Sequence, residues 1–60
     1  MKYRPFQRLR ESSKWHPVGY WKPYDEAFEI ASAYAKENPQ RTVALRGQDG
    51  STVCEWRLKP

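Results

Sequence analysis

The sequence holds very little cysteine and no long apolar run. Its one cysteine, Cys54, cannot form an intramolecular disulfide, which excludes the small secreted folds that depend on disulfides. A lone thiol is typical of a reducing compartment, so we expect a cytoplasmic protein. No stretch approaches the roughly 20 apolar residues of a membrane-spanning helix, and no apolar segment follows the basic N-terminus as it would in a signal peptide. We therefore expect no association with a membrane.

Residues that carry out catalysis or bind metals are also scarce. The three glycines lie at positions 19, 47 and 50, too far apart for a glycine-rich phosphate loop. His16 and Cys54 are ligands of the kind that zinc uses, but a structural zinc site needs about four. A catalytic pair of these two residues is conceivable, yet Cys54 falls on the inward side of a predicted strand, where a free cysteine usually acts as a small apolar residue. We expect no enzymatic activity, no metal and no cofactor.

Acidic residues are scarce outside the middle of the chain. Residues 23–40 hold four of the seven carboxylates and one of the eleven lysines and arginines, so the flanking segments hold ten cations against three carboxylates. The carboxylates of Asp25, Glu26 and Glu29 are expected on a solvated helix face rather than in a catalytic cleft. With a formal net charge of +4, this separation of charge favours a binding surface over an active site.

Sixty residues allow one domain, which we expect to span the whole chain, residues 1–60. Only 38% of the residues are hydrophobic, so the core must rely on large side chains. Three tryptophans, four tyrosines and two phenylalanines can supply them. A homodimer is the other common remedy for so thin a core.

Residues 24–37 are predicted to form one helix. Apolar side chains recur at the spacing of one helical face: Tyr24, Ala27, Phe28, Ala31, Tyr34 and Ala35. Pro23 is tolerated at a helix start, and acidic residues in the first turn suit the helix dipole. Asn38 precedes a proline and is therefore pushed out of the helical conformation, which ends the helix.

Residues 41–46 and 51–58 are predicted to form a hairpin, because Asp49-Gly50 is a strong two-residue turn signal. Counting outward from that turn gives an apolar face with the pairs Gln48/Ser51, Leu45/Cys54, Val43/Trp56 and Arg41/Leu58. The other face has the pairs Arg46/Val53, Ala44/Glu55 and Thr42/Arg57. One face is nearly all apolar and the other is polar, so the register is self-consistent.

Residues 3–10 and 15–22 are predicted to form a second hairpin around Ser12-Ser13. One face would carry Tyr3, Leu9, Val18 and Tyr20, and the other Arg4, Phe6, Arg8, Arg10, Trp15 and Trp21. Pro5 and Pro17 fit best at strand ends or edges. A bulge at Gly19 would exchange Tyr20 and Trp21 between the faces. Which of the two faces the core therefore stays open, although Trp21 is well placed to pack against Phe28.

The predicted fold is α+β with the element order ββαββ. A right-handed crossover that skips the first strand gives a four-stranded antiparallel sheet in the order 2-1-3-4. The helix covers one face of this sheet and the other face is open. The predicted core consists of Tyr24, Ala27, Phe28, Ala31, Tyr34, Val43, Leu45, Cys54 and Trp56.

The open face is the candidate binding surface. It would carry guanidinium groups interleaved with rings: Arg4, Phe6, Arg8, Arg10, Trp15, Arg46 and Arg57, with Thr42 among them. Single-stranded nucleic acid needs such charges for its phosphates and such rings for its bases. Tryptophan and arginine are also typical hot-spot residues for a protein partner, and a solvated face with cation–π pairs is the third interpretation. We expect a small binding module for nucleic acid or, alternatively, an inhibitor or adaptor that binds a host protein such as a nucleic-acid-processing enzyme.

Residues 19–27, Gly-Tyr-Trp-Lys-Pro-Tyr-Asp-Glu-Ala, resemble the step from strand to helix in several small α+β families. These are a class of plant DNA-binding domains, the arm-binding domains of tyrosine integrases and small phage inhibitors of bacterial RNA polymerase. The resemblance implies a shared way of packing strand against helix and no binding residues. The DNA-binding families place three strands before the helix, whereas this chain has room for two. A phage or mobile-element protein fits the short chain by analogy.

Overall fold

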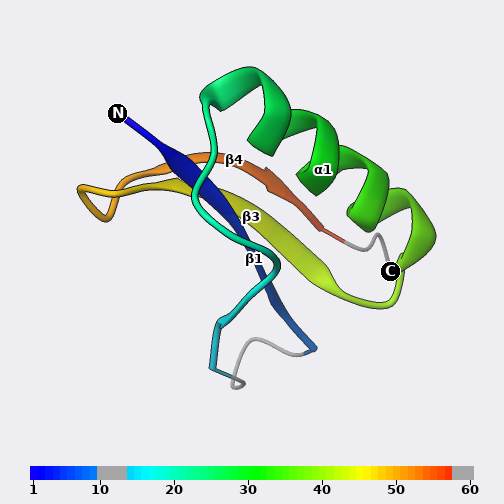
Figure 1. The fold of residues 1–60 in the computed structure, drawn as a ribbon. Coiled ribbons are helices and arrows are strands. Elements are labelled where there is room, and N and C mark those ends of the chain that lie inside the picture. Colours follow the sequence, from blue (N-terminus) through cyan, green and yellow to red (C-terminus); the bar gives the residue numbers. More distant parts are fainter. Residues whose placement is uncertain (10–13, 58–60) are drawn as a thin grey trace.

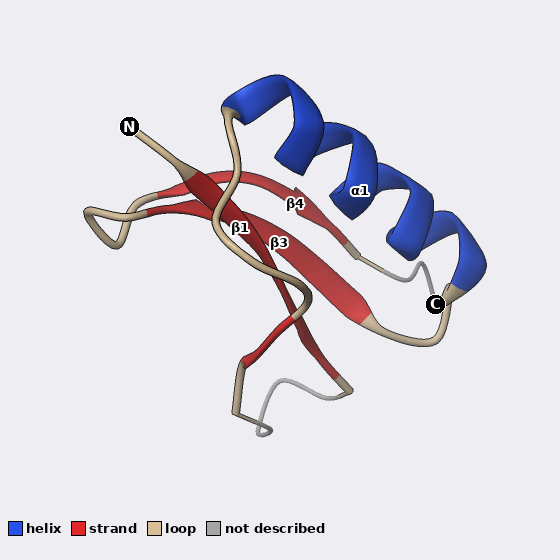
Figure 2. Ribbon diagram, viewed as in Figure 1, coloured by secondary structure: helices blue, strands red, loops and turns tan. Residues whose placement is uncertain are grey.

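The computed structural model describes residues 1–9 and 14–57, and it confirms the predicted α+β fold (Figure 1). The elements follow one another as β1 (Tyr3–Arg8), β2 (His16–Pro17), α1 (Tyr24–Glu37), β3 (Thr42–Gly47) and β4 (Thr52–Trp56). The strands form one antiparallel sheet in the order β2-β1-β3-β4, as the crossover rule predicts. α1 lies along one face of this sheet and leaves the other face without a helix (Figure 2).

α1 begins and ends where the sequence predicts. Pro23 precedes it, and two acidic residues occupy its first turn, where they suit the helix dipole. At the other end, the backbone N–H of Asn38 donates to the Tyr34 carbonyl at 2.9 Å, and Asn38 Nδ2 donates to the same carbonyl at 3.0 Å. Within the described residues, no helix has the length and apolar character needed to cross a membrane.

The β3–β4 hairpin has the predicted register in its middle. The pairs there are Val43 with Trp56, Ala44 with Glu55 and Leu45 with Cys54. The predicted two-residue turn is wrong, because the N–H of Gly47, and not Gln48, is bonded to the carbonyl of Ser51 at 2.9 Å. Three residues therefore form the loop, and Gly50 closes it with a φ of 89°. A glycine with positive φ is the usual last residue of a three-residue hairpin loop.

A bulge in β4 compensates for the longer loop. Arg46 pairs with Thr52 rather than with Val53 as predicted, and the register shifts by one residue between Leu45 and Arg46. The extra residue in the loop and the extra residue in β4 cancel, which restores the predicted pairs nearer the middle of the strands. The predicted partner of Arg41, Leu58, lies outside the described residues.

The second strand is much shorter than the predicted 15–22. Only His16 and Pro17 form a strand, and they pair with Gln7 and Phe6. Pro17 has no N–H with which to continue a regular ladder. The turn predicted at Ser12-Ser13 lies outside the described residues.

A bulge follows β2 at Gly19, where the sequence leaves a bulge open. The N–H of Val18 donates to the Pro5 carbonyl, and Lys22 and Tyr3 exchange two backbone hydrogen bonds, all at 2.8 Å. Residues 19–21 thus lie between these two contacts in the segment after β2, whereas only Arg4 lies between them in β1. Gly19 begins the bulge with a φ of 79°, which glycine adopts without steric cost.

Neither Tyr20 nor Trp21 enters the core. The ring of Trp21 packs at an angle on Phe6, with 6.3 Å between ring centroids, so the predicted contact with Phe28 is wrong. Tyr20 is 79% exposed. The bulge therefore directs both rings away from the layer between helix and sheet.

The core between α1 and the sheet is thin. Its fully buried members are Ala27, Ala31, Val43 and Leu45. Partly buried side chains surround them: Tyr3, Tyr34, Ala35, Cys54 and Trp56. Two predicted core residues, Tyr24 and Phe28, lie instead at the rim, 38% and 37% exposed, because the two alanines occupy the line of α1 nearest the sheet. At this rim Tyr24 contacts Tyr3 and Phe28, and Phe28 contacts Trp56, with ring centroids 5.1–5.8 Å apart.

The side chains of β1 alternate between the two faces of the sheet. Gln7 Oε1 accepts hydrogen bonds from the Tyr34 hydroxyl of α1, at 2.8 Å, and from the guanidinium of Arg41. Pro5 is buried, and Tyr3 packs against the core. These odd-numbered residues face α1, so the even-numbered residues of β1 point to the face without a helix.

Candidate nucleic-acid interface

Six side chains gather on and beside the sheet face that α1 leaves uncovered, and we call them the cationic aromatic face: Arg4, Phe6, Arg8, Trp15, Trp21 and Arg46. Three come from β1 and one from β3. The two tryptophans come from the segment that carries β2 and lies against β1 (cyan to teal in Figure 1). All six are half-buried.

Phe6 lies at the centre of this face. The guanidinium carbons of Arg46 and Arg4 lie 5.6 and 5.9 Å from the centroid of its ring. Arg4 also lies 5.7 Å from the ring of Trp21, and Arg8 lies 4.4 Å from the ring of Trp15. Guanidinium groups within about 6 Å of a ring are attracted to it. Charge and ring thus alternate across the face.

Arg4 and Arg46 are directly opposite each other in the β1–β3 register. Directly opposed residues share a face, and like charges in that arrangement are destabilising, by roughly 0.2–1 kcal/mol. Among the residues that the structure describes, neither arginine has a carboxylate partner. Arg4 Nε donates to the Gly19 carbonyl at 2.8 Å, and Arg46 Nη2 donates to the Gly50 carbonyl at 3.3 Å. These carbonyls orient the two guanidiniums but do not neutralise them.

Of the arginines predicted for this surface, Arg57 is not part of this cluster. Arg57 follows β4, on the far side of the sheet order from β2, and its Nε lies 2.5 Å from the Glu55 carboxylate. The charge of Arg57 is thus already matched within the chain. Arg10 lies outside the described residues. Thr42 pairs with Arg8 and so shares its face.

Trp21 is the member of the cationic aromatic face that the sequence left undecided. A simple two-residue alternation assigns it to this face, whereas a one-residue bulge would remove it. The bulge adds two residues relative to β1, so the alternation is restored at Trp21. The positive φ of Gly19 is the physical cause of this bulge. A glycine within a strand pattern is the feature of the sequence that indicates such a bulge.

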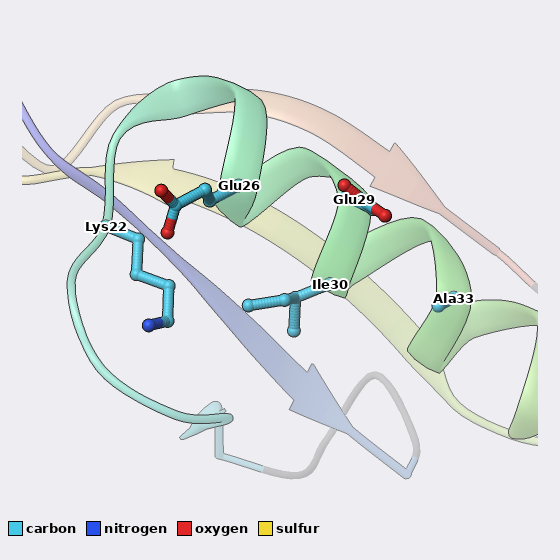
Figure 3. A pocket seen from close by; sticks show the side chains of 5 residues that line it. All are labelled: Lys22, Glu26, Glu29, Ile30 and Ala33. Carbon is cyan, nitrogen blue, oxygen red and sulfur yellow. The ribbon is translucent and has the colours of Figure 1, made fainter.

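The other side of the molecule has a different character. A hollow of about 350 Å³ lies between α1 and the segment before it, lined by Lys22, Glu26, Glu29, Ile30 and Ala33 (Figure 3). Two carboxylates and one ammonium line it, which disfavours phosphate. The hollow therefore belongs to the acidic helix side and not to the cationic aromatic face.

The conceivable pair of His16 and Cys54 is not brought together. His16 is in β2 and Cys54 is in β4, at opposite edges of the sheet, so three strand spacings, roughly 14 Å in total, separate their strands. Cys54 lies instead beside Tyr24, where burial of the hydroxyl and the neighbouring thiol raise the pKa of Tyr24. This geometry gives Cys54 the packing role that the sequence predicts for it.

The sequence matches no protein-family model, and neither the curated proteins nor the solved structures include one similar enough to count as a match. A function for this chain must therefore rest on the chemistry of the cationic aromatic face itself.

Proposed function

We propose that the protein is a small non-enzymatic binding module that holds nucleic acid on its cationic aromatic face. The observation that carries this proposal is the directly opposed pair of Arg4 and Arg46, which has no carboxylate partner within the described residues. A phosphate between the two guanidiniums would convert a repulsive contact into two charge-assisted attractions. Arginine suits this role because its planar fork can bind phosphate oxygens in pairs.

The rings favour nucleic acid over a simple anion. Phe6 lies near both opposed guanidiniums, and tryptophans lie beside Arg4 and Arg8. A free phosphate has no use for these rings, whereas a nucleotide chain offers bases that stack on them. Alternating charge and ring therefore matches the alternating phosphate and base of a single strand.

The distribution of charge supports an approach of nucleic acid from the side without a helix. Asp25, Glu26 and Glu29 lie on exposed positions of α1, on the other side of the sheet. A phosphate chain would be repelled there and attracted to the cationic aromatic face. The same separation gives the bound complex one orientation.

The salt dependence of binding tests this proposal. Fluorescence anisotropy with a short labelled single-stranded oligonucleotide should show affinity that falls with salt. One phosphate between Arg4 and Arg46, alone or with a second phosphate on Arg8, predicts a log–log slope between about −0.7 and −1.4. An affinity that does not change with salt, or no binding at low salt, would contradict the proposal.

A host protein is the alternative, because it would use the same residue types. A pull-down from lysate, with and without nuclease treatment, separates the two. Capture of nucleic acid that nuclease abolishes supports the proposal. Capture of one protein that survives nuclease, with no oligonucleotide binding, would replace nucleic acid with a protein inhibitor or adaptor of the phage type.

A further inference from the structure

Tyr20 is the most exposed large side chain among the tyrosines, tryptophans, phenylalanines and aliphatic residues that the structure describes, with 79% of its surface open. Within residues 1–9 and 14–57, no ring, guanidinium or hydrogen bond engages its side chain. An exposed tyrosine with no internal contact contributes little to the stability of the fold. Its position beside the cationic aromatic face is therefore informative about binding.

The backbone around Tyr20 is held on both sides. Val18 is bonded to Pro5, Lys22 exchanges two hydrogen bonds with Tyr3, and the Gly19 carbonyl accepts from Arg4, each at 2.8 Å. The ring is thus presented from a fixed bulge rather than from a loose loop, which lowers the entropy that a ligand must remove on binding. The hydrogen bond from Arg4 also places a guanidinium one residue away from Tyr20.

The three rings of the cationic aromatic face already lie near guanidinium groups. Arg4 and Arg46 lie over Phe6, Arg4 lies over Trp21, and Arg8 lies over Trp15. A base that stacked on the surface of a ring that already faces a guanidinium would have to displace that guanidinium. Tyr20 offers a ring face without that cost.

We propose that Tyr20 is a base-stacking residue and that the ligand of this face is single-stranded nucleic acid with unpaired bases. In this arrangement Arg4 and Arg46 hold a phosphate, and the adjoining base stacks on Tyr20 beyond the edge of the sheet. A duplex keeps its bases closed and could use the arginines but not the ring. This inference rests on the proposed function, since it names the form of nucleic acid that the same face binds.

Anisotropy titrations of single-stranded and duplex forms of one sequence test the inference, with the variants Tyr20→Leu and Tyr20→Phe. Tyr20→Leu should weaken single-strand binding by about tenfold or more, the loss of one stacked base, and Tyr20→Phe should retain it. The log–log slope of affinity against salt should be the same in both Tyr20 variants, because neither substitution removes a phosphate contact. Tyr24→Leu, which removes a partly exposed ring on the helix side, is the matched control and should leave affinity unchanged.

Several outcomes would overturn the inference. Equal affinity of Tyr20→Leu and the parent would remove Tyr20 from the site, as would an equal loss in Tyr24→Leu. Tighter binding of duplex than of single strand would assign the wrong form of nucleic acid. In each of these cases the parent still binds with a salt-dependent affinity, so the proposed function survives; no binding by the parent at low salt is the result that ends both.

Discussion

Two glycines hold backbone conformations that other residues rarely adopt. Gly19 and Gly50 have φ values of 79° and 89°, and a Cβ at either position would meet no atom within 4 Å. Space is therefore not what requires glycine there. The requirement is the left-handed backbone itself, which creates the bulge before α1 and closes the hairpin loop.

Gly50→Ala should destabilise the protein through the backbone alone. We expect a loss of about 1–2 kcal/mol in the free energy of unfolding, because an L-residue is strained at this φ. Gly50→Asn should lose less, since asparagine tolerates the left-handed region. Urea unfolding of both variants measures this, and an alanine variant as stable as the parent would show that the loop does not need its positive φ.

The hydrogen bonds of Asp49, in the same loop, predict that the stability of the fold depends on pH. The hydroxyl and the backbone N–H of Ser51 donate to its carboxylate, at 2.7 and 3.0 Å, and they lower its pKa below the ordinary value. A carboxyl with a lowered pKa stabilises the fold above its unfolded pKa, and that contribution is lost as the pH falls through the folded pKa. NMR titration should find that Ser51→Ala raises the pKa of Asp49. An unchanged pKa would mean that the Ser51 hydroxyl does not bond the carboxylate in solution.

At the scale of elements, the helix and the middle of the second hairpin were predictable, whereas the ends of the strands were not. The 3.6-residue spacing from Tyr24 to Ala35 and the proline after Asn38 suffice for α1. The pairs from Val43 to Leu45 came out correctly because two one-residue deviations, in the loop and at Val53, cancel. Asp-Gly suits both two- and three-residue loops, so the sequence alone did not distinguish them.

The close approach of α1 to the sheet depends on small side chains. Ala31 is fully buried against the core, whereas Ala33 is exposed beside the hollow on the helix flank. Ala31→Leu should overpack this contact and cost about 1–3 kcal/mol in the free energy of unfolding. Ala33→Leu adds the same atoms to the same helix and should change stability by less than about 0.5 kcal/mol. Equal effects of the two substitutions in thermal or urea unfolding would show that the buried face of α1 is misassigned.

At the scale of the whole molecule, the protein has an acidic helix side and a basic, aromatic sheet side. The alternation of Arg4, Phe6 and Arg8 along one strand was enough to predict that they share the open face, and the register adds Arg46 as expected. The sequence could not show that Glu55 of β4 engages Arg57, which follows that strand, because the contact depends on side-chain conformation. Nor could it decide the direction of Tyr20, which depends on the length of the bulge at Gly19.

If the opposed arginines form the binding site, affinity should depend on where a charge is reversed and not only on the net charge. Arg46→Glu and Lys36→Glu each lower the formal net charge from +4 to +2, but the first lies on the cationic aromatic face and the second lies at the end of α1. The affinity of both variants for a single-stranded oligonucleotide should be measured at one low salt concentration. Arg46→Glu should lose affinity by more than about tenfold, the loss of one charge-assisted contact, and urea unfolding should show that the variant is folded. Lys36→Glu should bind nearly as the parent does, and an equal loss in the two variants would contradict the account, because binding would then follow net charge rather than the face.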